Sequence, residues 1–186
     1  MLKNESKYRL PLFSLIAIIS LLLLFGIGVR FYLKLWGKEG IAVVEKAYSN
    51  GLDKKLVFLV DNKVYFESIE MNHGKVGSLY EINYCESYPD FSVLGDWIND
   101  SVCQGQTLFY LEEFPEGKTY ELRIYSNKNV SKKYVFQESF GIWLDKSKEY
   151  KIEVLNGNDV LYSSFLKSHD KVAVESILYN DMNYKR

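Results

Sequence analysis

The chain has 186 residues, of which 47% are hydrophobic and 25% are charged; this is the composition of a folded chain and excludes a disordered acidic or basic tail protein. The formal net charge of -1 argues against a nucleic-acid binder that depends on bulk positive charge. Aromatic residues reach 16%, with Tyr 15 and Phe 11, and these residue types favour strands, so we expect the folded part to be mainly β.

The N-terminal segment contains 20 consecutive residues without a charge, between Arg9 and Arg30. A helix of that length rises about 30 Å, which is the hydrocarbon thickness of a bilayer. The sequence therefore predicts an N-terminal tail at 1–9 and a transmembrane helix with its interfacial flank at 10–36. A cleaved signal peptide is the alternative, although its apolar region normally has only about 7–15 residues. The residues expected at the two membrane interfaces are Arg9, Arg30, Tyr32, Lys34 and Trp36.

Basic residues flank the helix on both sides, and the terminal amine gives the N-terminal flank a small advantage under the positive-inside rule. We therefore expect a single-pass protein of the bacterial inner (cytoplasmic) membrane with an extracytoplasmic C-terminal domain. The bacterial source is inferred from the excess of lysine over arginine and the many Asn, Ile and Tyr residues, which indicate AT-rich coding. A homo-oligomer formed through the helix is a further interpretation, because Ser14, Ala17 and Ser20 recur on nearly one face.

Period-two alternation follows the helix and predicts a first antiparallel β lobe at 40–103, built as a curled sheet or partial barrel. Its first strand begins at Ile41. Strands at 56–60 and 64–69 flank the polar turn Asp61-Asn62-Lys63, which is typical of a hairpin. Another strand is expected at 79–85. The following stretch to Gly105 is expected to be rich in turns, with room for one or two helical turns between Tyr88 and Asn99.

The remaining residues, 105–186, predict a second antiparallel β lobe, a small sandwich of about six strands in the Ig-like size class. One continuous sheet system is the alternative. The turn signals are Pro115-Glu116-Gly117 and Asn156-Gly157, the second of which is typical of a hairpin. The strands are expected at 107–114, 118–125, 133–138, 149–155, 160–166 and 172–178.

The first lobe also carries a sequence pattern in three pieces: Val57-Phe58-Leu59-Val60-Asp61-Asn62-Lys63-Val64-Tyr65, then Gly77 to Tyr84, then Tyr88-Pro89-Asp90-Phe91-Ser92. It resembles membrane-anchored bacterial β-domain families of unknown function, which have a transmembrane segment, a V-x-Y-x-V-x-G-K-x-Y hairpin, a G-D-x-V-x-V-x-Y strand and a closing N-P-x-x-S. Here Asp61-Asn62-Lys63 replaces the usual turn, and Ser87-Tyr88 replaces the Asn before the proline. The resemblance covers about a third of the chain and implies a β fold and an anchor, without catalytic residues.

Motifs that carry catalysis are missing from the sequence, which contains no His-Glu-x-x-His, Gly-x-Ser-x-Gly or phosphate-binding glycine loop. His73 and His169 lie in polar, turn-like contexts and lack the spacing of zinc ligands. The carboxylates between residues 86 and 100 lack the spacing of a calcium loop, and Glu112-Glu113 is typical of a charged turn. We therefore expect no enzymatic activity, no cofactor and no metal site.

The two cysteines, Cys85 and Cys103, are candidates for a disulfide bond. Closing the loop of 17 residues between them would stabilise the fold by about 3 kcal/mol in the chain-entropy model. The bond forms only outside the reducing cytoplasm, so this prediction depends on the predicted orientation. Two buried thiols are the alternative.

Aromatic side chains are the candidate contacts with a partner, and core packing is the alternative for each of them; the candidates are Tyr88, Phe91, Trp97 and Trp143. The residues after Trp36 carry a net charge of -5, which argues against a nucleic-acid partner. We expect a non-enzymatic single-pass membrane protein whose β-rich domain binds or scaffolds a protein partner, as an accessory subunit of a bacterial envelope complex. The alternatives are a membrane-anchored inhibitor or immunity-type protein that captures a basic toxin, and a glycan-binding module or hydrolase.

Overall fold

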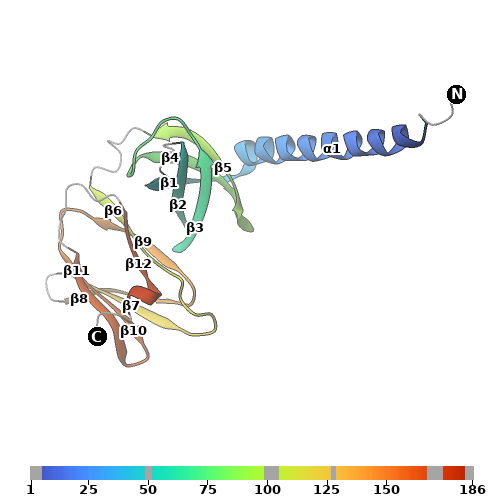
Figure 1. Ribbon diagram of the computed structural model, residues 1–186. Coiled ribbons are helices and arrows are strands. Elements are labelled where there is room, and N and C mark those ends of the chain that lie inside the picture. The colour runs from blue at the N-terminus through green and yellow to red at the C-terminus, as the bar shows by residue number, and fades with distance from the viewer. Residues whose placement is uncertain (1–5, 49–51, 99–104, 127–128, 167–173, 183–186) are drawn as a thin grey trace.

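A computed structural model describes residues 6–48, 52–98, 105–126, 129–166 and 174–182. It consists of a β-rich body and one long N-terminal helix, α1 (Ser6–Trp36), that leaves the body as an isolated rod (Figure 1). Within α1, Ser14–Trp36 is long and apolar enough to cross a membrane, and its apolar stretch is not buried inside the protein as a core helix would be. A signal sequence near the N-terminus would pass the same test of length and composition. The predicted fold class, mainly β after an N-terminal apolar helix, is confirmed.

The first lobe is a curled antiparallel sheet with the strand order β3-β2-β1-β4-β5. Its strands are β1 (Lys38–Ala47), β2 (Asp53–Val60), β3 (Lys63–Glu70), β4 (Leu79–Cys85) and β5 (Tyr88–Ile98). The sheet curls far enough for its two edges to meet, because the Ser92 hydroxyl of β5 donates a hydrogen bond to Glu67 Oε2 of β3 at 3.0 Å. The concave side encloses a core that includes Phe58, Tyr80 and Ile82. The predicted curled sheet is therefore confirmed.

The hairpin predicted between β2 and β3 is present, and its turn has the geometry that the sequence requires. Asp61 and Asn62 have φ values of 50° and 65°, and Val60 pairs with Lys63 across them. Positive φ at both central residues is what a type I′ turn needs, and Asn and Asp tolerate that conformation better than other side chains.

The stretch predicted to be rich in turns after Cys85 is instead a long edge strand, β5, which pairs with β4 from Cys85 to Leu79. The prediction of turns or a short helix was wrong because Pro89, Asp90 and Gly95 are usual turn residues. The register shifts between Tyr84 and Cys85 and between Tyr80 and Ile82, so β5 contains bulges. Bulges and proline are common on edge strands, because an edge strand has a neighbour on one side only and its outward backbone N–H groups are not needed for pairing.

The second lobe consists of two sheets that face each other across one core. Its strands are β6 (Gln106–Glu112), β7 (Tyr120–Ser126), β8 (Asn129–Phe136), β9 (Phe140–Asp145), β10 (Tyr150–Asn156), β11 (Asp159–Leu166) and β12 (Val174–Leu178), followed by the short helix α2 (Tyr179–Met182). The strand orders are β11-β10-β7-β8 and β12-β6-β9. Aromatic rings fill much of the core between the sheets, and Phe114 contacts Tyr120, Phe136 and Tyr179 with ring centroids 4.7–5.2 Å apart.

Two features of this lobe differ from the sequence-based expectation. Strand β9 was not predicted, because Phe140-Gly141-Ile142-Trp143-Leu144 shows no period-two alternation. Strand β12 pairs with β6 in parallel, whereas antiparallel pairing was expected throughout. The hairpin predicted at Asn156-Gly157 is present, with Asn156 paired to Asp159 and Gly157 at a φ of 60°.

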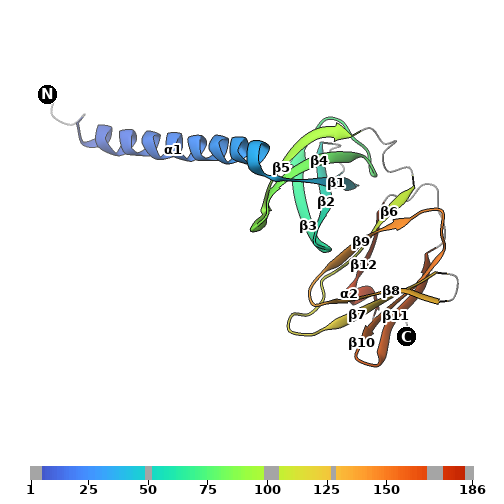
Figure 2. The same cartoon turned by 180° about the vertical axis from the view of Figure 1, so that it is seen from behind.

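The outer face of the first sheet packs against the second lobe. Val43, Val57 and Leu79 of the first lobe form a buried cluster with Leu108 and Tyr110 of β6. The tip of the β2–β3 hairpin completes the contact, because the Gly141 amide of β9 donates a hydrogen bond to the Asn62 carbonyl at 2.7 Å. Strands β1 and β2 are therefore buried on both faces, and the two lobes form one body (Figure 2).

The last turn of α1 packs against β4 and β5. Leu33 is only 2% exposed, although every other side chain described in the last two turns is half-buried or exposed. Gly37 follows immediately, and a Cβ there would lie 2.3 Å from the Leu33 carbonyl oxygen and 3.3 Å from Asn83 Cβ. The chain therefore passes from helix to strand without a linker, and Leu33 joins the last turn of α1 to the body.

Candidate functional site

The exposed aromatic side chains of the first lobe are concentrated on β5, at its two ends. Tyr88 and Phe91 lie near the start of the strand, are 66% and 57% exposed, and contact each other edge to face at 6.4 Å. Trp97 lies at the opposite end and is 54% exposed. Tyr88 pairs with Cys85 and Trp97 pairs with Tyr80, so the two sites lie five residues, or about 17 Å, apart along β4 and are separate surfaces. All three residues were predicted as candidate partner contacts with core packing as the alternative, and all three are exposed.

Trp97 borders a shallow hollow of about 400 Å³ that is otherwise lined by His73, Gly74, Lys75 and Ser78. The other lining residues belong to the loop between β3 and β4. Trp97 lies beside this loop because it pairs across the sheet with Tyr80 of β4. His73 in this loop is exposed, which agrees with the interpretation of a solvated loop histidine.

The loop that forms the rim of this hollow is held by hydrogen bonds. The Tyr80 hydroxyl donates to the His73 carbonyl at 3.3 Å, and the Lys75 amide donates to the Ser78 hydroxyl at 3.0 Å. Gly74 has a φ of 91°, and a Cβ there would lie 2.4 Å from the Tyr80 hydroxyl oxygen. The hollow beside Trp97 is therefore preformed, which lowers the ordering cost of any contact made there.

Trp143, the fourth predicted contact, is half-buried on β9 and packs against the cluster between the lobes. It therefore takes the core alternative, and a partner would not reach most of its ring. Sequence alone did not separate it from Trp97, because both lie in short polar and apolar stretches without a clear period.

Polar side chains also meet between the lobes. Lys55 Nζ lies 2.9 Å from Glu45 Oε2 and 3.9 Å from the centre of the Phe66 ring. Burial raises the pKa of Glu112 on β6, Lys55 opposes that shift, and the Glu45 carboxylate adds to it. Burial also raises the pKa of the neighbouring Tyr110 hydroxyl strongly, with further increases from Glu45 and Glu112. This arrangement joins the lobes, because Glu45 and Lys55 belong to the first lobe and Tyr110 and Glu112 belong to β6 of the second.

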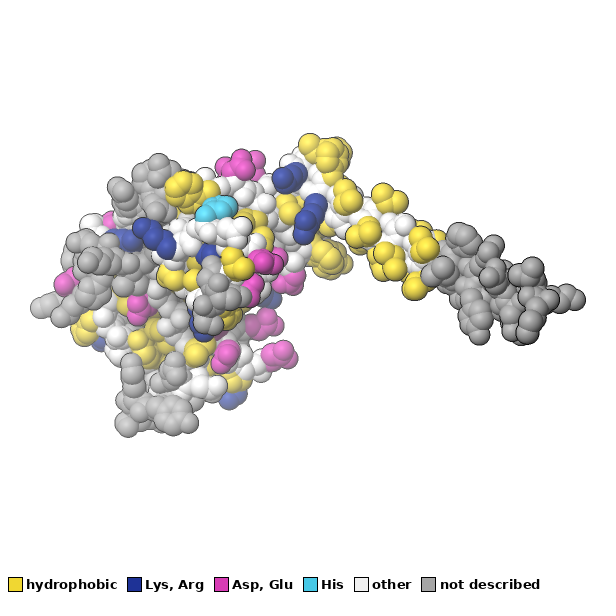
Figure 3. All heavy atoms as spheres, turned by 45° about the horizontal axis from the view of Figure 1, so that its top comes forward, with side chains coloured by type: hydrophobic (Ala, Val, Ile, Leu, Met, Phe, Trp, Pro, Cys, Tyr) yellow, Lys and Arg dark blue, Asp and Glu magenta, His cyan; other side chains and the backbone are white. Residues whose placement is uncertain are grey.

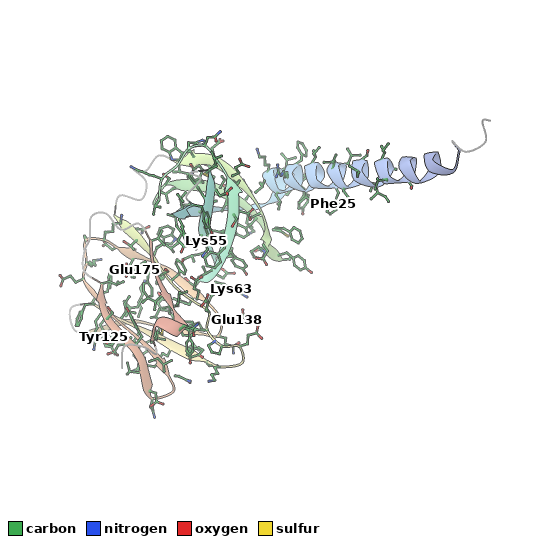
Figure 4. All side chains as sticks on the ribbon, in the orientation of Figure 1. Phe25, Lys55, Lys63, Tyr125, Glu138 and Glu175 are labelled. Atoms are coloured by element: carbon green, nitrogen blue, oxygen red, sulfur yellow. The ribbon has the colours of Figure 1, made fainter. Side chains whose placement is uncertain are left out.

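A wider depression of about 460 Å³ separates the β2–β3 hairpin from the segment after β8. Lys63 and Glu138 face each other across it (Figure 4), with Lys63 Nζ 3.0 Å from Glu138 Oε2. The hydrogen bond that Lys63 donates to Glu138 raises the pKa of Lys63 more than desolvation lowers it. Both side chains are about half exposed, so the pair contributes little to stability.

The predicted disulfide involves one described residue. Cys85 is half-buried at the end of β4 and has no disulfide partner among the described residues. Cys103 lies outside them, as do Asp100 and His169, so the bond stays a prediction. Within the described ranges, no group of three or more His, Cys, Asp or Glu side chains is placed to hold a metal ion.

The predicted interfacial residues occupy the two ends of the apolar rod. Arg30, Tyr32, Lys34 and Trp36 are all exposed, and the rings of Tyr32 and Trp36 contact at 5.5 Å. Figure 3 shows hydrophobic side chains along the rod and Lys and Arg side chains where it meets the body. Arg9 belongs to α1, but its side chain lies outside the described part of the structure.

Sequence reasoning named Trp97 as a candidate contact but did not predict the hollow beside it. The His73–Ser78 loop comes near Trp97 only because β5 pairs with β4, and β5 itself was not predicted. The sequence signal for this loop is the pair Gly74 and Gly77, because glycine adopts positive φ without steric cost. Both glycines have positive φ in the structure, and the Gly77 amide donates a hydrogen bond to the Val44 carbonyl at 2.8 Å.

The chain matches no protein-family model, no curated protein and no solved structure. Its function is therefore argued from its own surface.

Proposed function

We propose that this chain is a non-enzymatic single-pass membrane protein of the bacterial inner membrane whose β-rich body binds a protein partner. The anchor is α1, which has the length and composition of a transmembrane helix. The body is extracytoplasmic in this proposal and serves as an accessory subunit of an envelope complex. The pairing of a β11-β10-β7-β8 sheet with a β12-β6-β9 sheet supports describing its second lobe as Ig-like.

The observation that carries the proposal is the exposed Trp97 beside a preformed hollow. Tryptophan is enriched among the residues that dominate the binding energy of protein interfaces, typically where a ring fills a pocket surrounded by weaker contacts. Here the ring and the hollow belong to the same surface, and Val76 in the rim loop is also exposed. A partner that covers the ring and places an apolar side chain in the hollow would bury both.

Co-purification from the native host after extraction in mild detergent tests this proposal. We expect a partner in stoichiometric amount with the wild type, retained by the Phe165→Ala variant and lost from the Trp97→Ala variant. Phe165 is the matched control, because it is 69% exposed and lies on β11 in the other lobe. A wild-type protein that elutes as a clean monomer, or equal retention of the partner by both variants, would contradict the proposal.

The anchor is tested separately by washing membranes with alkaline carbonate. We expect the full chain to stay with the membrane, because an apolar helix of 23 residues is not released by high pH. Reporter fusions after Trp36 then determine the side of the membrane on which the body lies. Release of the full chain into the supernatant would contradict the anchor but would leave binding at Trp97 open.

A further inference from the structure

The exposed pair Tyr88 and Phe91 lies at the end of the body from which the helix leaves. Strand β1 starts directly after α1, and its first residue, Lys38, pairs with Tyr84 near the end of β4. Strand β4 therefore runs back toward the helix, and the turn at Glu86 lies beyond the level of Lys38. The 3.6 Å contact between Lys38 Nζ and Glu86 Oε1 agrees with that placement.

The depth of this turn relative to a bilayer follows from the buried Leu33. Leu33 lies three residues beyond Arg30, which is about 4.5 Å along a helix. The polar layer on each side of the hydrocarbon core is about 5–7 Å thick. If Arg30 marks the end of the hydrocarbon core, the body already touches α1 within this polar layer. In both ribbon views the free end of the β4–β5 hairpin lies on the helix side of the body (Figures 1 and 2).

We propose that the β4–β5 hairpin docks on the bilayer surface, with Tyr88 and Phe91 in the interfacial layer beside α1. The inference rests on the membrane anchor of the proposed function and adds a second contact of the body with lipid. The occupant of this aromatic surface is a lipid headgroup layer rather than a protein, because the register places the rings beside the point where the rod leaves the bilayer.

The chemistry of the two rings suits that layer. Tyrosine combines an apolar ring with a polar hydroxyl and is enriched at membrane–water interfaces, as are the Tyr32 and Trp36 rings expected at the same level. Phe91 follows Pro89 in a bulge where the register of β5 shifts, and the bulge turns its ring outward instead of into the sheet.

Charge does not drive this contact. Glu86 and Asp90 lie beside the rings, and the Glu86 carboxylate is paired with Lys38. We therefore expect the rings to dock on zwitterionic lipid without a requirement for anionic lipid. Two contacts, α1 and the hairpin, would fix the tilt of the body and direct Trp97, at the other end of β5, away from the membrane.

Photo-crosslinking of the full chain in phosphatidylcholine vesicles tests the proposal. The variant Phe91→p-benzoylphenylalanine should form lipid adducts on irradiation, detected by mass spectrometry, and Tyr88→p-benzoylphenylalanine should do so as well. The matched control is Phe165→p-benzoylphenylalanine, which is at least as exposed but lies in the second lobe and should give no adduct above background. All three positions are exposed, so the body should unfold at the wild-type temperature in each variant.

The outcomes separate this inference from the anchor. Protein that resists carbonate but gives no lipid adduct at 88 or 91 overturns hairpin docking and leaves the anchor intact. Equal adducts at 91 and 165, or a crosslink from 91 to a second copy of the chain, also overturns it. Release of the protein by carbonate would contradict the membrane anchor, on which this inference rests.

Discussion

Replacing Gly141 with alanine tests how tightly the two lobes are joined. A Cβ at this position would lie 2.3 Å from Leu59 Cδ2 and 3.2 Å from Val64 Cγ2. Carbon atoms in contact normally lie about 3.5–4.0 Å apart, so the alanine requires more than about 1 Å of movement. Gly141 is not among the residues with positive φ, so its backbone accepts alanine and the cost comes from overpacking alone.

Overpacking of this kind typically costs about 1–3 kcal/mol. For a body of this size we expect the unfolding temperature to fall by about 2–4 °C for each kcal/mol. Because the clashing atom is the end of a leucine side chain, the cost depends on how freely Leu59 can turn. Leu59→Ala removes that atom; it should itself cost near the lower end of about 2–5 kcal/mol, since the side chain is half-buried.

The double variant Gly141→Ala/Leu59→Ala decides between a local clash and a general weakening of β9. We expect Gly141→Ala to cost less than about 0.5 kcal/mol in the Leu59→Ala background, which gives a favourable coupling energy. Thermal unfolding of the full chain in detergent, followed by tryptophan fluorescence and near-UV circular dichroism, measures all four proteins. Equal costs of Gly141→Ala in both backgrounds would refute the close approach of the lobes at this point.

Three further predictions concern charged groups. Hydrogen bonds from the Ser147 hydroxyl and amide lower the pKa of Asp145 to about 2, so its contribution to stability is present above its ordinary pKa of 3.8 and is lost as the pH falls toward 2. The unfolding temperature of Asp145→Asn should therefore change less with pH between 4 and 2 than that of the wild type. The same pH dependence in both proteins would contradict this role. Burial raises the pKa of Glu112, so its contribution to stability is fully present below 4.5 and is lost as the pH rises and the carboxyl ionises. Glu112→Gln should therefore raise the unfolding temperature at pH 7 and leave it unchanged at pH 4. A lower unfolding temperature of this variant at pH 7 would show that the carboxylate is needed. Lys63→Met should lower the free energy of unfolding by only about 0.2–1 kcal/mol, and by less in high salt, because the pair with Glu138 is half exposed. The raised pKa of Lys63 means that this contribution is present at pH 7 and is lost only above 10.5. A larger loss, or one that salt does not change, would contradict a surface ion pair.

Local chemistry explains which parts of the fold could be predicted. The apolar rod needs only an uncharged segment between Arg9 and Arg30, and the two hairpins need only Asp61-Asn62 and Gly157 in conformations that these residue types accept. The exposed Trp97 was predicted as a candidate contact, but its hollow depends on the pairing of β4 with β5. The register between β4 and β5 is interrupted by two bulges, and no short sequence pattern encodes these bulges.

The sequence by itself determined the membrane-length helix, most of the strands and the curled first sheet, because each follows from charge, periodicity or turn chemistry within a few residues. Tertiary structure alone decided that β1 and β2 are buried on both faces, since Val43 and Val57 lie under a lobe whose first strand, β6, begins 63 and 49 residues later in the sequence. It also decided the parallel contact of β12 with β6 and the packing of the last turn of α1 against β4 and β5. These features depend on contacts between distant segments, whose free energy appears only when the whole body has formed.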